Sequence, residues 1–130
     1  MGARLPSSAS TFLQNAALSG NGEFIVLTTP PMNPSIDFQL VMIFAYINVT
    51  PGASTTGVIG RIRRGATAAG PLLSLSNTLT VAAGNSFQFM MCYIDIPGAV
   101  AGVQYTFTAQ TVAQTVQAAV NDGCIIAFAL

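Results

Sequence analysis

The chain is short of charge. It contains no lysine and no histidine, and its four arginines are balanced by only four acidic residues. Charged residues make up 6% of the chain, against about 25% in ordinary soluble domains. The formal net charge is zero, whereas a small soluble domain usually carries a net charge of roughly 2–8 in magnitude. Because 52% of the residues are hydrophobic, the composition predicts a surface largely covered by other protein chains.

These absences also argue against catalytic and metal-binding chemistry. Without histidine, the chain lacks the usual general base and the commonest metal ligand. Cys92 and Cys124 form no zinc-binding spacing, and each lies in an apolar run, where a free cysteine behaves as a small hydrophobic residue. The glycines between residues 57 and 70 are followed by no lysine, which a phosphate-binding loop requires. We therefore expect no enzymatic activity, no metal, no cofactor and no small-molecule substrate.

Long apolar runs are missing too. The longest unbroken run, LVMIFAYI at residues 40–47, is far shorter than the roughly 20 residues of a membrane-spanning helix. The N-terminal MGARLPSSAS lacks the apolar segment of a signal peptide. We expect no membrane partner, and the length of 130 residues fits a single domain.

What the chain does contain is the pattern of an all-β protein. Turn signals such as SGNG, TPG, AAGN and NDG separate runs rich in Val, Ile, Phe, Tyr and Thr. Their regular spacing predicts a sandwich or barrel. The segment TAQTVAQTVQAAV could instead be a helix, although its Thr and Val favour a strand. Strands are predicted near residues 11–18, 23–29, 37–49, 56–64, 71–76, 77–82, 86–95, 103–111, 114–120 and 124–130.

The predicted strands are of two kinds. From Val103 to Gln110, apolar and polar residues alternate, as in a half-buried strand with a polar outer face. The runs at 38–47 and 87–94 are instead apolar on both faces. A two-sheet sandwich buries only one face of each sheet, so a second apolar face needs a cover, and a neighbouring subunit is the simplest one. On the strand at 86–95 the candidate interface residues are Phe87, Phe89, Met91 and Tyr93.

Three of the four arginines lie in GVIGRIRRG, residues 57–65. Strand alternation places Arg61 and Arg63 on one face and Arg64 on the other. On a solvated edge strand these charges would discourage aggregation. At a protein interface they would pair with carboxylates, either Asp37 and Asp95 in a ring of identical subunits or acids of another protein. Phosphate contacts are a third use, but a neutral chain lacks a broad basic field, so we expect no nucleic-acid partner.

The order of motifs over about residues 40–111 resembles the small jelly-roll modules of tailed-phage structural proteins. One part of the similarity is an IRRGT-like strand, here IRRGAT at residues 62–67. The other is a segment that joins two late strands through Tyr93, Asp95, Pro97, Tyr105 and Thr106. The family pattern has small polar residues after the proline, and this chain has GAVA at 98–101 instead.

The resemblance implies an all-β jelly-roll β-sandwich, similar to tumour-necrosis-factor-like domains, which typically trimerise. The trimer axis would be lined by the second apolar faces. It also implies a single domain, with residues 1–20 as an N-terminal arm or first strand and residues 21–130 as the jelly roll. The implied function is that of a capsid decoration (cement) protein on the virion surface, which bridges subunits of the major capsid protein. The alternatives are the receptor-binding head of a phage tail fibre or spike, and a minor or major capsid jelly-roll protein.

Overall fold

The computed structural model describes residues 8–19, 22–34, 39–52, 55–98, 100–112 and 117–130. The regular elements in these ranges are strands, and no helix there is long and apolar enough to cross a membrane. The strands are β1 (Ser8–Ser19), β2 (Phe24–Thr28), β3 (Val41–Pro51), β4 (Thr56–Arg64), β5 (Leu72–Leu75), β6 (Leu79–Val81), β7 (Phe87–Asp95), β8 (Tyr105–Thr111) and β9 (Gln117–Ala129).

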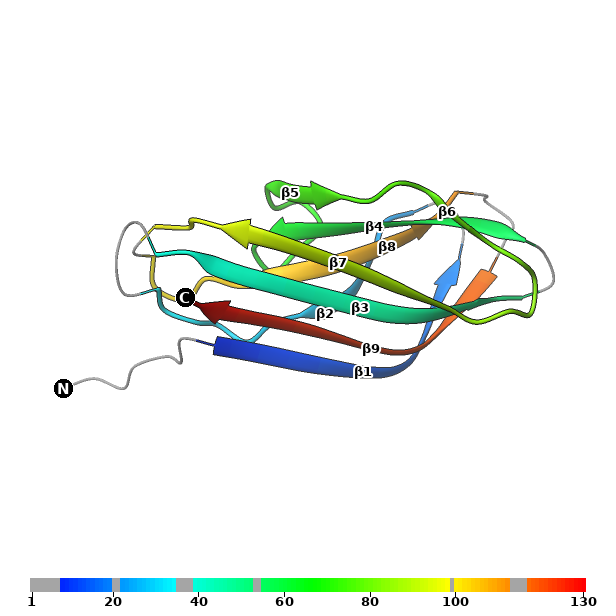
Figure 1. The fold of residues 1–130 in the computed structure, drawn as a ribbon, viewed down its shortest axis with the longest axis horizontal. Helices are drawn as coiled ribbons and strands as arrows, with labels where there is room; N and C mark the ends of the chain where they lie inside the picture. Colours follow the sequence, from blue (N-terminus) through cyan, green and yellow to red (C-terminus); the bar gives the residue numbers. More distant parts are fainter. Residues whose placement is uncertain (1–7, 20–21, 35–38, 53–54, 99, 113–116) are drawn as a thin grey trace.

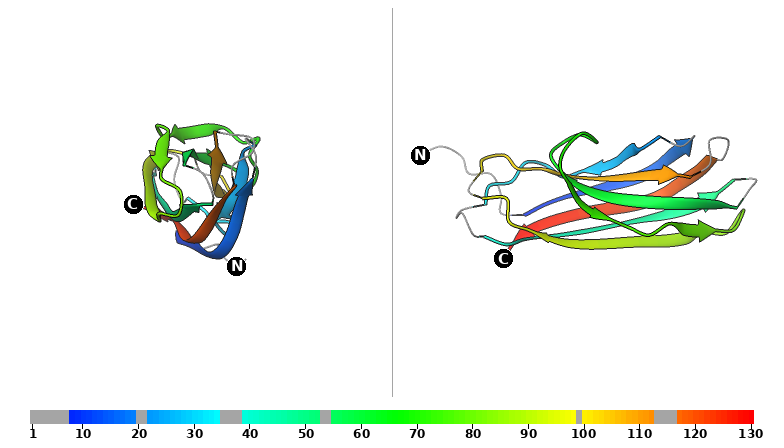
Figure 2. Two further views of the ribbon diagram at one scale, coloured as in Figure 1. Left: turned by 90° about the vertical axis from the view of Figure 1, so that its right-hand side faces the viewer. Right: turned by 90° about the horizontal axis from the view of Figure 1, so that it is seen from above.

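The strands form two antiparallel sheets. Sheet A has the order β1-β9-β3-β7, and sheet B has the order β2-β8-β4-β5, with β6 also paired to β4. The chain therefore crosses between the sheets repeatedly, as it does in a jelly roll. Figure 1 shows the strands running along the long axis, and the end-on view in Figure 2 shows them enclosing a common interior. The predicted all-β jelly-roll sandwich is confirmed.

The core lies between the sheets and follows the two-residue period of the strands. Every second residue of β3 from Val41 to Val49 is buried, and the residues between them are half-buried on the outside. Phe89 of sheet A meets Phe107 of sheet B with ring centroids 6.3 Å apart. Gly60 makes room for these rings, because a Cβ there would lie 2.5 Å from Phe89 Cε1 and 3.0 Å from Phe107 Cε2.

The strand predictions were correct for most of the chain and wrong at the NDG signal. Strand β9 runs through residues 121–123 and pairs with β1 and β3 on its two sides. Gly123 is required there for close packing, because a Cβ would lie 2.8 Å from Ile47 Cγ2 and 2.9 Å from the backbone carbonyl oxygen of Tyr46. Residues 117–120 are strand, so the helix alternative is wrong for them, while residues 113–116 lie outside the described ranges.

The N-terminal region also differs from a free arm. Residues 8–19 form β1, which pairs with β9 from Ser8 to Ser19. These residues are therefore an integral strand of sheet A, and residues 1–7 lie outside the described part of the chain.

Candidate interaction surfaces

The outer face of sheet A is apolar across β9, β3 and β7. The register places Met42 between Ile94 and Phe128, and the other outward residues of β3 follow in step. Residues directly opposite on paired strands share a face, so these side chains form one continuous surface. On the edge strand β7, Met90 is 56% exposed and Ile94 is 48% exposed. We call this surface the outer apolar face, and it consists of Met42, Phe44, Tyr46, Met90, Cys92, Ile94, Ile126 and Phe128.

The outer apolar face is similar in extent to the largest apolar patches of typical monomers. Strands lie about 4.8 Å apart and alternate residues on a strand roughly 7 Å apart, so three short rows cover on the order of 300 Å² of flat area. Apolar patches of roughly 300–600 Å² are the largest on typical monomers and are often functional. The face ends at a polar row in which Asn48 lies between Gln88 and Asp122 and donates its amide to the Asp122 carboxylate.

The residues of β7 predicted to form an interface lie on the face of the strand that points toward the core. Phe89 and Met91 point into the core and are buried, so they are not available to a neighbouring subunit. Phe87 is exposed at the start of the strand, and Tyr93 is half-buried against the core. The pattern could not decide this, because both faces of β7 are apolar and only its register with β3 fixes which one points inward.

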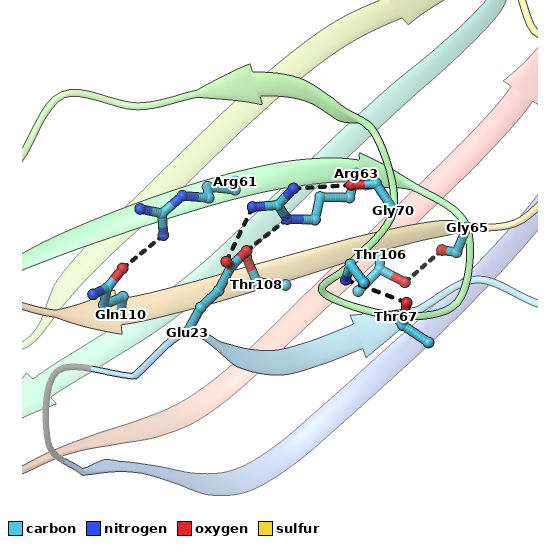
Figure 3. A network of polar contacts seen from close by, with 10 residues as sticks. Glu23, Arg61, Arg63, Gly65, Thr67, Gly70, Thr106, Thr108 and Gln110 are labelled. Carbon is cyan, nitrogen blue, oxygen red and sulfur yellow. Dashed lines mark hydrogen bonds and ion pairs between the residues drawn. The ribbon is translucent and has the colours of Figure 1, made fainter.

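The outer face of sheet B carries a polar network around two arginines (Figure 3). Arg63 donates Nε and Nη2 to the Glu23 carboxylate at 2.8 and 3.1 Å, and Nη1 to the Gly70 carbonyl at 2.9 Å. Glu23 also accepts the Thr108 hydroxyl at 2.5 Å. The hydrogen bonds from Arg63 hold the pKa of Glu23 below its ordinary value, although partial burial opposes the shift.

Arg61 lies beside this pair and has a neutral partner. Its Nη1 donates to Gln110 Oε1 at 2.8 Å, and no carboxylate within the described ranges forms an ion pair with it. Strand β4 lies inside sheet B, with β8 on one side and β5 and β6 on the other. The interpretation of the arginines as a solvated edge is therefore wrong.

The outer face of β8 is also more covered than its alternation predicted. Thr106 and Thr108 point outward from the core, yet both are fully buried. Thr106 donates its hydroxyl to the Gly65 carbonyl at 2.7 Å, and Thr108 donates to Glu23. Both hydroxyls are thus hydrogen-bonded within the protein, as buried polar groups normally are.

Arg64 points the other way and joins the two sheets. It donates Nε to Asp95 Oδ2 at 2.9 Å and Nη2 to Oδ1 at 2.5 Å. Tyr105 donates its hydroxyl to the same Oδ2 at 2.9 Å. Asp95 belongs to sheet A, whereas Arg64 and Tyr105 belong to sheet B. Burial, together with the hydrogen bond to Asp95, raises the pKa of Tyr105 well above its ordinary value near 10.

One of the two carboxylates expected as partners of the arginines is bound within the same chain. Asp95 pairs with Arg64 of its own subunit, and its side chain is only 5% exposed, so it is not presented to a neighbour. Asp37 lies outside the described residues. No pattern in the sequence indicates that Glu23 is the partner of Arg63, because the two are 40 positions apart. Only the register of β2, β8 and β4 brings them together.

The two cysteines of the described part of the chain differ in exposure. Cys92 is exposed and Cys124 is buried, both are free thiols, and burial raises the pKa of the Cys124 thiol. Among the residues described, no three histidine, cysteine or acidic side chains are grouped in a way that could hold a metal ion. What the geometry provides is two contrasting surfaces, the outer apolar face on sheet A and the arginine network on sheet B.

Comparison with known proteins identifies the fold. No protein family and no curated protein matches the sequence. A chain of the T13 particle of infectious bursal disease virus matches with a TM-score of 0.62 and 4% identity, over 96% of this chain and 32% of that one. The VP2 subviral particle of the same virus gives 0.58 and 5%, over 94% and 33%. The Eiger tumour necrosis factor of S. frugiperda gives 0.57 and 9%, over 98% and 94%.

These similarities define the class of protein to which the fold belongs. The chain spans about a third of the viral chains and nearly all of the tumour necrosis factor chain. Since the identities are below a tenth, the likeness establishes a jelly-roll β-sandwich and nothing finer.

Proposed function

We propose that this chain is a structural protein of a virus particle, a capsid decoration protein that forms trimers and stabilises the shell by bridging subunits of the major capsid protein. The observation that carries the proposal is the outer apolar face of sheet A. A chain with 6% charged residues cannot leave such a face in water without risking aggregation. Identical subunits have this face in common, and the tumour-necrosis-factor-like domains that the chain resembles typically trimerise.

The role of such a protein is mechanical, and we propose no catalytic function. Burying about 300 Å² of apolar area stabilises association by roughly 7 kcal/mol per subunit at 25 cal/mol per Å². Association costs an estimated 4–15 kcal/mol in lost freedom, so residues around the rim of the face must add to the interface. The similarity in fold to chains of a viral particle supports a place in a virion.

The assembly can be tested with the purified chain. Met90→Glu and Ile94→Glu each place a charge on the exposed part of the outer apolar face, and Thr80→Glu adds the same charge at an exposed position of β6. Analytical ultracentrifugation should give a trimer of the 13.4 kDa chain for the wild type and for Thr80→Glu, and smaller species for the two face variants. A wild-type chain that stays monomeric and soluble in dilute buffer would contradict the proposal.

A second candidate is a component of the shell itself, which the fold shared with viral-particle chains favours. The two roles differ in what happens when the chain is removed. Particles remain closed when a decoration protein is stripped from them, whereas removal of a shell subunit opens the shell. Gel densitometry of purified particles separates both roles from a fibre or spike head, which would be present in a few tens of copies or fewer per particle.

A further inference from the structure

A row of side chains crosses the outer face of sheet B from one edge to the other. The register aligns Leu75 of β5 with Arg61 of β4, Arg61 with Thr108 of β8, and Thr108 with Ile25 of β2. Leu75 is 57% exposed and Ile25 is 50% exposed. The row therefore places one cation between two exposed aliphatic side chains, the combination of arginine and apolar contact that is typical of protein interfaces. We call it the Arg61 row.

The charge of this face is unbalanced. Glu23 neutralises Arg63, whereas Arg61 is bound by the uncharged Gln110 through one of its N–H groups. A guanidinium has five N–H donors, so Arg61 retains donors for another partner. Its hydrogen bond to Gln110 holds the side chain along the sheet, which lowers the entropy lost when a partner binds. The described residues on this face carry a net charge of +1, from two arginines and one glutamate.

The described residues of another copy offer little to satisfy Arg61. Of the three acids in the described ranges, Glu23 and Asp95 are engaged by arginines of their own subunit. Asp122 accepts a hydrogen bond from Asn48 at the end of the outer apolar face, which the proposed trimer buries. None of the acids in the described ranges is therefore available to Arg61 of another copy, which favours a carboxylate from a different protein. A nucleic acid is a poorer fit, because one net positive charge provides little of the electrostatic attraction on which phosphate binding depends.

We infer that the Arg61 row is the docking surface for the shell protein, and that Arg61 receives a carboxylate of that protein flanked by apolar side chains. This inference rests on the proposed function and names the chemistry of its partner. Sheet A then serves contacts between copies, and sheet B faces outward from the trimer toward the shell.

The test uses particles stripped of this chain and reloaded with purified variants. Arg61→Gln removes one positive charge, and Asn85→Asp, in the exposed turn after β6, changes the net charge by the same amount away from the row. Arg61→Gln should weaken binding by about 30-fold, the ratio that corresponds to a hot-spot loss of about 2 kcal/mol. Asn85→Asp should bind within about twofold of the wild type, because surface changes away from the contact have little effect.

Two further variants separate charge from folding. Glu23→Gln raises the local charge to +2 and should tighten binding at low salt. Partial unfolding of this variant would weaken binding instead, so tighter binding can be attributed to the charge. Arg61→Lys keeps the charge but loses the planar fork, so it should recover only part of the affinity. Circular dichroism and sedimentation of each variant show whether the trimer is intact before it is added to the particles.

Different outcomes would contradict either the decoration role or the docking inference alone. If wild-type trimers do not bind stripped particles at all, the decoration role fails. If they bind and Arg61→Gln binds equally well, the docking inference alone is overturned. It is also overturned if Arg61→Gln abolishes binding to a short single-stranded oligonucleotide, or abolishes association between trimers without affecting the particles.

Discussion

Replacing Asp95 by alanine tests whether the two sheets are fastened together by a buried polar cluster. In the native structure the carboxylate accepts two hydrogen bonds from Arg64 and one from the Tyr105 hydroxyl. Asp95→Ala removes all three at once. The Tyr105 side chain is fully buried and cannot turn to water, whereas the Arg64 side chain is 35% exposed and can be partly hydrated.

The expected loss follows from these exposures. An orphaned buried hydroxyl costs about 1–3 kcal/mol, and breaking a fully buried ion pair costs roughly 3–5 kcal/mol. Because Arg64 can reach solvent, we expect the lower part of the combined range, about 3–4 kcal/mol for Asp95→Ala. Tyr105→Phe leaves the ion pair intact and should cost only about 1 kcal/mol. In the double variant no hydroxyl is orphaned, so its loss should be smaller than the sum of the two by about 1–2 kcal/mol.

Urea unfolding at a fixed subunit concentration measures these differences, since the stability of an oligomer depends on concentration. Circular dichroism follows the loss of strand structure. Strict additivity of the two substitutions would refute the reasoning, because it would mean that Tyr105 and Asp95 do not depend on each other. So would a loss below about 1 kcal/mol for Asp95→Ala, the size expected of an ordinary surface ion pair.

Three other predictions concern packing, pH and thiol chemistry. Gly60→Ala should lower the free energy of unfolding, measured in urea, by about 1–3 kcal/mol, because the added Cβ has no room between two core phenylalanine rings. Gly22→Ala should be nearly neutral, because a Cβ at that position would lie 3.7 Å from its nearest neighbour. Folding lowers the pKa of Glu23 from its ordinary value of about 4.5. The stability that Glu23 contributes is therefore present at pH values above about 4.5 and is lost as the pH falls through the lower pKa of the folded state. The free energy of unfolding should consequently fall less steeply with decreasing pH in Glu23→Gln than in the wild type. Cys92 should react with a thiol reagent in subunits kept monomeric by a charge on the outer apolar face, and it should be protected in the trimer. Cys124 should react only on unfolding. Equal reactivity of Cys92 in the monomer and the trimer would argue against burial of that face.

The sequence predicted those features that depend on local periodicity. Alternation alone put Val41 and Ile43 on one face and Met42 on the other, because a strand sends successive side chains to opposite faces. Only the structure shows that the face of Val41 and Ile43 is the buried one. The same rule separated Arg61 and Arg63 from Arg64 correctly. The all-β fold followed from the spacing of turns and from β-branched runs, and these signals need no knowledge of the partner strand.

Features that depend on register between distant strands could not be predicted. Strand β7 is apolar on both faces, so only its pairing with β3 shows that Phe89 points inward and Met90 outward. The pairing of Glu23 with Arg63 likewise requires three strands in their final order. Gly123 was misread as part of a turn, because a glycine needed for close packing looks the same in sequence as one needed for a bend.

The pairing of the first and last strands has a consequence for protein engineering. Ser8 at the start of β1 lies opposite Phe128 near the end of β9, so these two points of the polypeptide are neighbours on adjacent strands. A brief linker between them would give a continuous ring, which could be reopened at the exposed turn around Gly84. Such a circular permutant would preserve every strand while moving both tails to the opposite pole of the sandwich, which would provide a new point for attaching a tag or cargo.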